Sequence, residues 1–173
     1  MSDWNMLTLV GQDRPGIVAR VTRALFSAGC TLGEASMLRL GGSFTILLMV
    51  KGSKPCDALR AALAPVAQEL GLRIHLDPVQ GGLHQHLIPN VQVRVAGADR
   101  PGIVADVTEV LAAGGFNILE LESDVAGDPE RPVYIMNIQG YCERTLEDLK
   151  QALAPLAERG VAADVSAVDL LIG

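Results

Sequence analysis

A long internal repeat constrains the fold of this chain more than any other feature. Residues 11–19, Gly-Gln-Asp-Arg-Pro-Gly-Ile-Val-Ala, recur 86 positions later as residues 97–105, Gly-Ala-Asp-Arg-Pro-Gly-Ile-Val-Ala. Further along, the run Ala-Leu-Ala-Pro at 62–65 recurs at 152–155, an offset of 90. Two copies at so long a period are typical of tandem domains, not of the short stacked units of a solenoid.

Both copies predict the same order of elements. Apolar runs at 6–10 and 91–96 predict a first strand, and apolar residues spaced three, four and seven apart predict an amphipathic helix that ends at Gly29 or at the Gly114-Gly115 pair. Strands are then expected at 31–40 and 43–50, joined by a tight turn through Gly41-Gly42. In the second copy the turn is expected to be longer, residues 126–132. This turn is expected to hold the four additional residues by which the offset grows from 86 to 90.

A second helix and a last strand complete each copy. Pro65 and Pro155 fall inside the second helical pattern and are expected to kink or divide it. The last strands are expected at 73–76 and 161–168. The order βαββαβ predicts an α+β protein with two ferredoxin-like domains, each an antiparallel four-stranded sheet with two helices on one face. We assign residues 1–80 and 90–173 to these domains and 81–89 to a linker.

Composition and charge exclude several classes of function. No apolar stretch approaches the roughly 18 residues of a membrane span, and the N-terminus does not read as a signal peptide, so a cytoplasmic protein is expected. The chain has 14 basic and 20 acidic residues, a net charge of −6, and only 3% aromatic residues. Scattered basic residues and few aromatics argue against direct nucleic-acid binding. The cysteines, Cys30, Cys56 and Cys142, are interpreted as buried or half-buried free thiols.

The repeated loop has the chemistry of an anion site. Proline suits the first turn of a helix, and the glycine that follows leaves the backbone N–H groups of the helix N-terminus open to an anion such as an α-carboxylate. Asp13 and Asp99 are then placed to meet an α-ammonium group, or alternatively to cap the helix. Arg14 and Arg100 are candidates to contact a carboxylate or a neighbouring domain.

At this loop the sequence resembles the ACT domain family, the small-molecule sensing modules of amino-acid metabolism. The resemblance rests on the Asp-Arg-Pro-Gly-Ile-Val loop, the helix ends Gly-Cys-Thr-Leu at 29–32 and Gly-Phe-Asn-Ile at 115–118, and the βαββαβ order. Two copies without a catalytic domain are most similar to the glycine cleavage repressor family. The resemblance implies a regulatory protein that binds an amino acid, with glycine or serine as the guess, and acts through a protein partner.

The resemblance also implies which residues bind the ligand, at an interface between modules. They belong to the loop after the first strand and to the start of the second strand: Gln12, Asp13, Arg14, Pro15, Gly16, Ile17 and Thr31, and Ala98, Asp99, Arg100, Pro101, Gly102, Ile103 and Asn117. If one copy binds more tightly, we expect the second, because the Asn117 amide both donates and accepts hydrogen bonds. A homodimer without cofactor is expected.

Two other classes of function compete with this interpretation. An enzyme would need catalytic groups, and the candidates are few: His75 in a strand, His84 and His86 in the linker, and the repeated pair Glu34 and Glu120, which a polar strand face explains. The linker histidines would also be the ligands of any metal. The other alternative is a dimeric interaction scaffold without ligand, or a stand-alone regulatory subunit of an enzyme. A thermal shift induced by a free amino acid separates the sensor from the scaffold.

Overall fold

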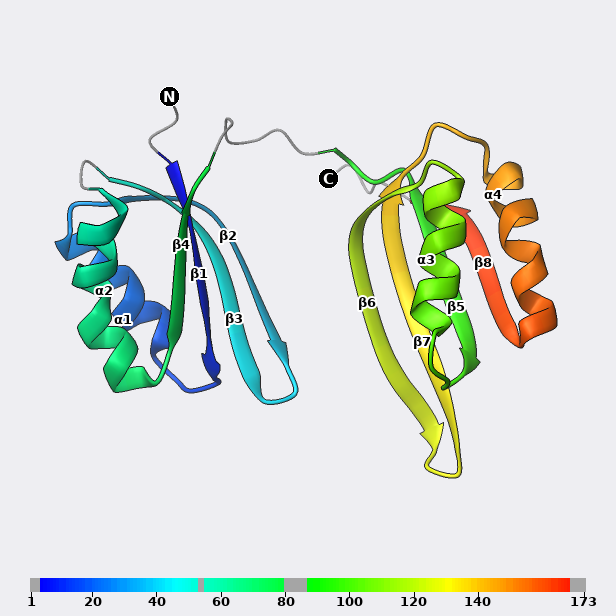
Figure 1. The fold of residues 1–173 in the computed structure, drawn as a ribbon, viewed down its shortest axis with the longest axis horizontal. Coiled ribbons are helices and arrows are strands. Elements are labelled where there is room, and N and C mark those ends of the chain that lie inside the picture. Colours follow the sequence, from blue (N-terminus) through cyan, green and yellow to red (C-terminus); the bar gives the residue numbers. More distant parts are fainter. Residues whose placement is uncertain (1–3, 53–54, 80–86, 169–173) are drawn as a thin grey trace. The chain divides into compact units, whose positions relative to one another are not determined.

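The computed structural model describes residues 4–52, 55–79 and 87–168. The chain divides into two compact units, Met1–Gln85 and His86–Gly173, which we call the first and second modules and describe separately. The order of elements is βαββαβ in each, as predicted (Figure 1).

In the first module, both helices cover one face of an antiparallel sheet with strand order β2-β3-β1-β4 (Figure 1). Its elements are β1 (Trp4–Gln12), α1 (Ile17–Ser27), β2 (Thr31–Leu40), β3 (Ser43–Lys51), α2 (Cys56–Leu70) and β4 (Arg73–Pro78).

The second module repeats this arrangement with strand order β6-β7-β5-β8. Its elements are β5 (Val91–Ala98), α3 (Ile103–Ala113), β6 (Asn117–Asp128), β7 (Arg131–Tyr141), α4 (Leu146–Leu153), the 3-10 helix η1 (Ala154–Arg159) and β8 (Val161–Ala167). The predicted fold class, two ferredoxin-like domains in tandem, is confirmed.

Each module has its own hydrophobic core between sheet and helices. Alternate residues of the central strand, Leu7 and Leu9 in β1, are fully buried against Val21 and Leu25 of α1. The second core is built in the same way, from Val93, Val95, Val107 and Leu111 among others. Each side chain of this size contributes roughly 1.5–3 kcal/mol by its burial. The core thus fixes the position of the first strand and first helix, and with them the loop between the two.

The prediction of a long turn at residues 126–132 is wrong. The β6–β7 ladder continues to the pair Asp128↔Arg131, so the turn consists of Pro129 and Glu130 alone. The four additional residues lengthen the strands: β6 and β7 have 12 and 11 residues, whereas β2 and β3 have 10 and 9. The longer hairpin extends past the end of β5 (Figure 1).

The position of Pro132 explains why this proline does not end the ladder. Its carbonyl accepts a hydrogen bond from Asp99 N at 3.3 Å, so the backbone of residue 132 is directed to the β5 side and not to β6. Its missing N–H therefore removes no bond from the β6–β7 ladder. Asp128 Oδ1 accepts from Glu130 N at 3.1 Å and closes the turn, a role typical of Asp before Pro.

The two prolines of the second helical pattern behave differently. Pro155 lies where α4 gives way to η1, so the second module confirms the predicted division. Pro65 lies inside α2, which is not divided. We attribute this continuity to tertiary packing, because Leu63, Ala67 and Leu70 on either side of the proline are buried in the core.

Candidate functional site

The repeated loops follow β1 and β5 and lead into α1 and α3. In each module the aspartate N–H ties the loop to the turn end of the neighbouring hairpin: Asp13 N donates to Gly42 O at 3.2 Å, and Asp99 N donates to Pro132 O at 3.3 Å. Gly16 and Gly102 are the N-caps of the helices, with φ of 88° and 89°. This left-handed conformation favours glycine, so the glycine of the motif is required by the turn.

Two details of the sequence interpretation need correction here. Pro15 and Pro101 precede the glycine N-caps and lie in the turn instead of the first turn of the helix. Neither Asp13 nor Asp99 caps a helix, because no side chain accepts a hydrogen bond from the first turn of α1 or α3. Since a glycine occupies the N-cap, the first-turn N–H groups have no side-chain acceptor, and of those in α3 Ile103 N donates to Arg100 O at 3.5 Å.

In the first module the charged loop side chains have partners close by. The Asp13 carboxylate forms an ion pair with Arg39 of β2, Oδ2 to Nε 2.7 Å, and Arg14 donates to Gln12 Oε1 at 3.0 Å. Beside them lies an open pocket of about 380 Å³ lined by Asp13, Arg14, Gly16, Ile17, Val18, Ala19, Met37, Arg39 and Phe44. The pocket combines both signs of charge with an apolar wall.

In the second module the loop arginine turns back onto its own helix. Arg100 donates to Asp106 Oδ2 at 2.8 Å, and Arg159 of η1 reaches the same oxygen at 2.8 Å. The Arg100 hydrogen bond, joined by the charge of Arg159, outweighs desolvation and holds the pKa of Asp106 below its ordinary value. Asp99 forms no ion pair with any residue in the described parts of the chain.

The sheet register explains the contrast between the two aspartates. Gly11 is opposite Phe44, which is opposite Arg39. At the equivalent place Gly97 is opposite Tyr134, which is opposite Val125. Val125 therefore occupies the position of Arg39 and leaves Asp99 without the arginine that neutralises Asp13.

A second difference between the modules is an ion pair that joins the first helix to the end of the second helical segment. In the first module Arg20 donates to both carboxylate oxygens of Glu69. The equivalent positions, 86 and 90 residues later, carry Asp106 and Arg159, so the same ion pair is present with its signs reversed. Sequence reasoning missed this pair, although aligning the repeats would have revealed the opposite charges.

Thr31 and Asn117 lie far from the loops of their own modules. Thr31 pairs with Lys51, opposite Trp4 at the start of β1, whereas the loop follows Gln12 at its end. Eight strand residues separate the two ends, on the order of 25 Å. Asn117 lines a separate open pocket of about 310 Å³, with Leu87, Gly114, Gly115, Tyr141, Glu143 and Arg144. A ligand that touches both a loop and one of these residues must be shared with another module.

Of the fourteen predicted site residues, two are core residues. Ile17 and Ile103 are buried, so only their backbones could face a ligand. The others are exposed or half-buried: Gln12, Asp13, Arg14, Pro15, Gly16, Thr31, Ala98, Asp99, Arg100, Pro101, Gly102 and Asn117. Met37, Arg39 and Phe44, which line the pocket of the first module, were not anticipated because the hairpin brings them to the loop from a distance in sequence.

The other candidates do not gather into a site. His75 lies in β4 and contacts Asp77, Nε2 to Oδ1 3.3 Å. Glu34 and Glu120 lie on β2 and β6, and His84 and His86 lie outside the described residues. Cys30 and Cys56 are half-buried and Cys142 is buried, all as free thiols. Over residues 4–52, 55–79 and 87–168 no three side chains have a metal-binding arrangement.

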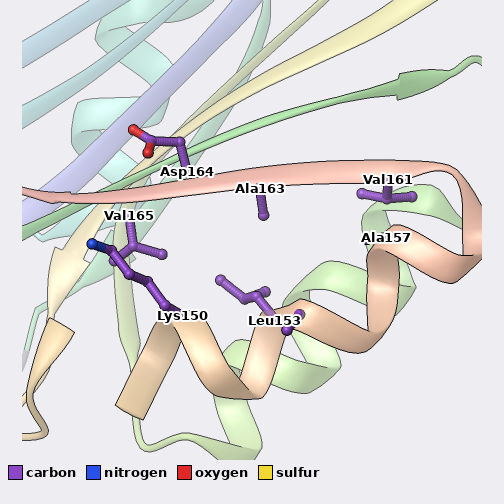
Figure 2. Close-up of a pocket in the computed structure, with 8 residues that line it drawn as sticks. Lys150, Leu153, Ala157, Val161, Ala163, Asp164 and Val165 are labelled. Atoms are coloured by element: carbon purple, nitrogen blue, oxygen red, sulfur yellow. The ribbon is translucent and has the colours of Figure 1, made fainter. Parts of the chain in front are cut away.

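A shallow groove of about 250 Å³ runs between β8 and the α4–η1 segment (Figure 2). Lys150, Leu153 and Ala157 line it from the helix side and Val165 from β8, whereas the Asp164 side chain points to the other side of β8. Its small apolar floor and lone lysine offer no pair of opposite charges that would hold a zwitterion.

None of the described helices is both long and apolar enough to cross a bilayer.

Comparison with known proteins agrees with the geometry. A family model described as ACT domain matches residues 6–77 and 90–165. The chain is 32% identical over 119 residues to the glycine cleavage system transcriptional repressor of Escherichia coli K12; the alignment covers 68% of this chain and 63% of that relative. It is 35% identical over 74 residues to a UPF0237 protein of Methanococcus maripaludis, which covers 41% of this chain and 82% of that protein.

Two solved structures share the fold over nearly the whole chain. An unknown protein from Galdieria sulphuraria superposes with a TM-score of 0.77 at 26% identity, over 96% of this chain and 98% of that one. A candidate glycine cleavage system transcriptional repressor superposes with a TM-score of 0.70 at 21% identity, over 95% and 96% of the two chains. The chain belongs to the ACT domain family and carries two of its domains in tandem.

Proposed function

We propose that this protein is a non-enzymatic regulator that binds a small amino acid and modulates transcription or metabolism through a partner protein. The observation that carries the proposal is the contrast between the two loop aspartates. Asp13 is neutralised by Arg39, whereas Asp99 has no ion pair within the described residues. The second module is therefore the one we assign to the ligand.

The proposed contacts follow from the charges of an amino-acid zwitterion. Its ammonium group would lie against the Asp99 carboxylate, and its carboxylate would accept hydrogen bonds from the first-turn N–H groups of α3 behind Gly102. These N–H groups carry the positive end of the helix dipole and lack a side-chain cap. Arg100 is not assigned a direct contact with the ligand, because its guanidinium donates a hydrogen bond to Asp106.

Asn117 enters the proposal as the residue through which binding couples to assembly. It lies at the far end of the second module from its own loop, so its amide would reach the ligand only from a neighbouring module. Ligand binding at such a shared place would stabilise the assembled state, as expected for an amino-acid sensor that is a homodimer. Glycine and serine are the ligands we propose to test first.

The partner is proposed to be a protein. The relative at 32% identity is a transcriptional repressor by name, but a net charge of −6 with scattered basic residues disfavours direct contact with DNA. Control of transcription would then pass through another regulator.

The test is a thermal-shift panel of the twenty amino acids at millimolar concentration with the full chain, followed by calorimetric titration of any hit. A ligand at a hundredfold excess over its Kd stabilises the folded protein by roughly 2.7 kcal/mol. Asp99→Asn is expected to weaken binding roughly tenfold or more, since a hydrogen bond to a charged group contributes about 1.5–3 kcal/mol. The matched variant Asp13→Asn is expected to bind like the wild type.

A second pair of variants tests why the modules differ. Val125→Arg places in the second module the arginine that holds Asp13 in the first, and it should reduce binding. Arg39→Val should free Asp13 and add a weak second site to the titration. Unchanged binding by a folded Asp99→Asn protein would refute the assignment. No response to any of the twenty amino acids would favour the scaffold.

A further inference from the structure

The strand β4 forms an open edge of the first sheet. It is the last strand in the order β2-β3-β1-β4, and its sequence is Arg73-Ile74-His75-Leu76-Asp77-Pro78. An edge strand presents unpaired backbone groups that a second chain can extend. Whether a given edge does so depends on which backbone groups face outward and on the side chains beside them.

The hydrogen-bond pattern shows which residues of β4 face outward. Val79 N donates to Trp4 O at 3.0 Å, which makes these two residues a hydrogen-bonded pair. Such pairs alternate along an antiparallel ladder, so Asp77, His75 and Arg73 bond toward β1. The N–H and C=O groups of Ile74 and Leu76 therefore point to the open edge. Leu76 O confirms this direction, because it accepts a long hydrogen bond, 3.5 Å, from the half-exposed Arg60.

One antiparallel register uses all four of these groups in a second molecule. With Ile74 opposite Leu76 of the other chain, and the reverse, four backbone hydrogen bonds form around a twofold axis at His75. The same register sets Arg73 opposite Asp77 of the other molecule, twice, on the sheet face away from the helices. Directly opposite residues of opposite charge stabilise a ladder.

The sign of the charges distinguishes this edge from a protected one. Edges commonly avoid pairing by carrying like charges, which repel a second copy. On the face of β4 away from the helices, the side chains follow the order Arg73, His75, Asp77, that is positive, imidazole, negative. A second copy of the strand running in the opposite direction presents the complementary charges. These side chains are accessible to another chain, since those of His75 and Asp77, which contact each other, are 73% and 59% exposed.

The matching strand of the second module lacks this property. Val168 N donates to Asn90 O, so Ala163 and Val165 of β8 face the open edge and Asp164 occupies the position of His75. The same twofold register would set Asp164 against Asp164 and Ala162 against Ser166. Like charges directly opposite are unfavourable, so β8 is not self-complementary.

We propose that two molecules of this protein associate through their β4 edges, antiparallel and centred on His75, to form an eight-stranded sheet from two first modules. The partner is a second copy of the chain, and the inference does not depend on amino-acid binding by the loops.

Disulfide trapping tests the register. Opposed residues of a pair without hydrogen bonds have Cα atoms about 4.5 Å apart, within the range that a disulfide spans. His75→Cys should therefore give a covalent dimer under mild oxidation, whereas wild type, with its three native cysteines, and the matched β8 variant Asp164→Cys should not. A monomeric wild type in solution, or cross-linking of Asp164→Cys as efficient as that of His75→Cys, would overturn the proposal.

Charge reversal tests the complementarity without any cysteine. Arg73→Asp and Asp77→Arg should each self-associate roughly tenfold or more weakly than wild type, since each turns two attractive pairs into repulsive ones. Mixed together, the two single variants should form a heterodimer, because every pair is then again of opposite charge. Sedimentation of the separate and mixed variants gives the answer. The pairing would be ruled out if either variant alone self-associated as strongly as the wild type, or if the mixture of the two stayed monomeric.

Discussion

The two modules share a fold but neutralise their charges in opposite ways. Arg20–Glu69 in the first becomes Asp106–Arg159 in the second, at the same place between the first and second helices. The reversal keeps the pair but changes its surroundings, because Asp106 also captures the loop arginine, Arg100. A fold can thus conserve an interaction while altering the charge that its loop presents.

A second difference concerns volume instead of charge. Phe116 is buried in the second module, and a Cβ on Gly140 would lie 2.3 Å from its ring and from the Asn117 carbonyl oxygen. The equivalent positions in the first module hold Cys30 and the buried Val50. The first module fills this space from β3, through Val50, and the second from the residue before β6, Phe116, so the two residues of each pair are coupled.

The largest expected effect comes from breaking this coupling. Gly140→Val should destabilise the second module by about 3 kcal/mol, the upper part of the range for overpacked cores. Trp4, the single tryptophan, lies in the first module, so its fluorescence reports that module while circular dichroism reports both. In urea, the Trp4 transition should stay in place while part of the dichroism is lost earlier.

The rescue variant for this change is Phe116→Cys/Gly140→Val, which copies the first module. It should recover the part of the lost stability that comes from the Phe116 ring, while the contact with the Asn117 carbonyl oxygen remains. A double variant as unstable as Gly140→Val alone would show that the two positions are not coupled.

The next largest effect is a loss of stability on replacing the N-cap glycine by alanine, and this loss should be equal in the two modules. Gly16→Ala and Gly102→Ala place a Cβ in a left-handed conformation, at a cost of roughly 1–2 kcal/mol. An added Cβ would meet nothing closer than 4.0 Å at either position, so strain and not collision sets the cost. Gly102→Val would likewise act on the loop through backbone strain, because the valine would have the same left-handed conformation and its Cβ the same open surroundings. Urea midpoints followed by Trp4 fluorescence for the first variant and by dichroism for the second should fall alike; unequal losses would contradict the shared turn geometry.

A smaller effect is expected from the reversed ion pair. Asp106→Arg places three arginines together, with Arg100 and Arg159, and should lower the thermal midpoint of the second module. Asp106→Arg/Arg159→Glu recreates the pair of the first module and should restore the midpoint while releasing Arg100 from the helix. If the double variant melts no higher than the single one, the two modules do not use equivalent pairs.

The smallest effect is a dependence on pH. The pKa of Asp106 is lowered by Arg100 and Arg159, so its ionised form stabilises the folded state above the ordinary carboxyl value of about 3.9. This contribution is lost as the pH falls through the lower folded-state pKa. Asp106→Asn should therefore be less stable than wild type at pH 7, and the gap should narrow toward pH 2. Urea midpoints at several pH values measure it, and a constant gap would contradict the assignment.

Much of the fold followed from local pattern. The Gly41-Gly42 turn, with φ of 57° and 76°, and the helix end at Gly29 were predictable because glycine has a specific conformational use at each position. The β6–β7 turn was not, because the string Gly-Asp-Pro-Glu-Arg-Pro contains turn formers throughout. Only the ladder direction at Pro132 shows that a proline there is harmless.

The candidate site was predictable only in part, for a related reason. The loop residues are contiguous in sequence, so the repeat identifies them directly. The residue that distinguishes the modules, Arg39 against Val125, comes from the adjacent hairpin, where Arg39 and Val125 keep the offset of 86 but their partners Phe44 and Tyr134 have an offset of 90. No local pattern signals that Arg39 meets Asp13, since that contact depends on the strand register.

The longer hairpin of the second module has gained the same number of residues in each of its two strands. Its four extra residues are shared as two in each strand, and because side chains alternate between faces, an even addition leaves every later residue on its original face. Unequal additions to the two strands would have shifted the β6–β7 register, so that a bulge would be needed to keep the buried side chains of β7 facing the core. The reach of this arm can therefore change by equal additions to both strands while the core beneath it stays unchanged, and the two residues added to each strand here extend it by roughly 7 Å.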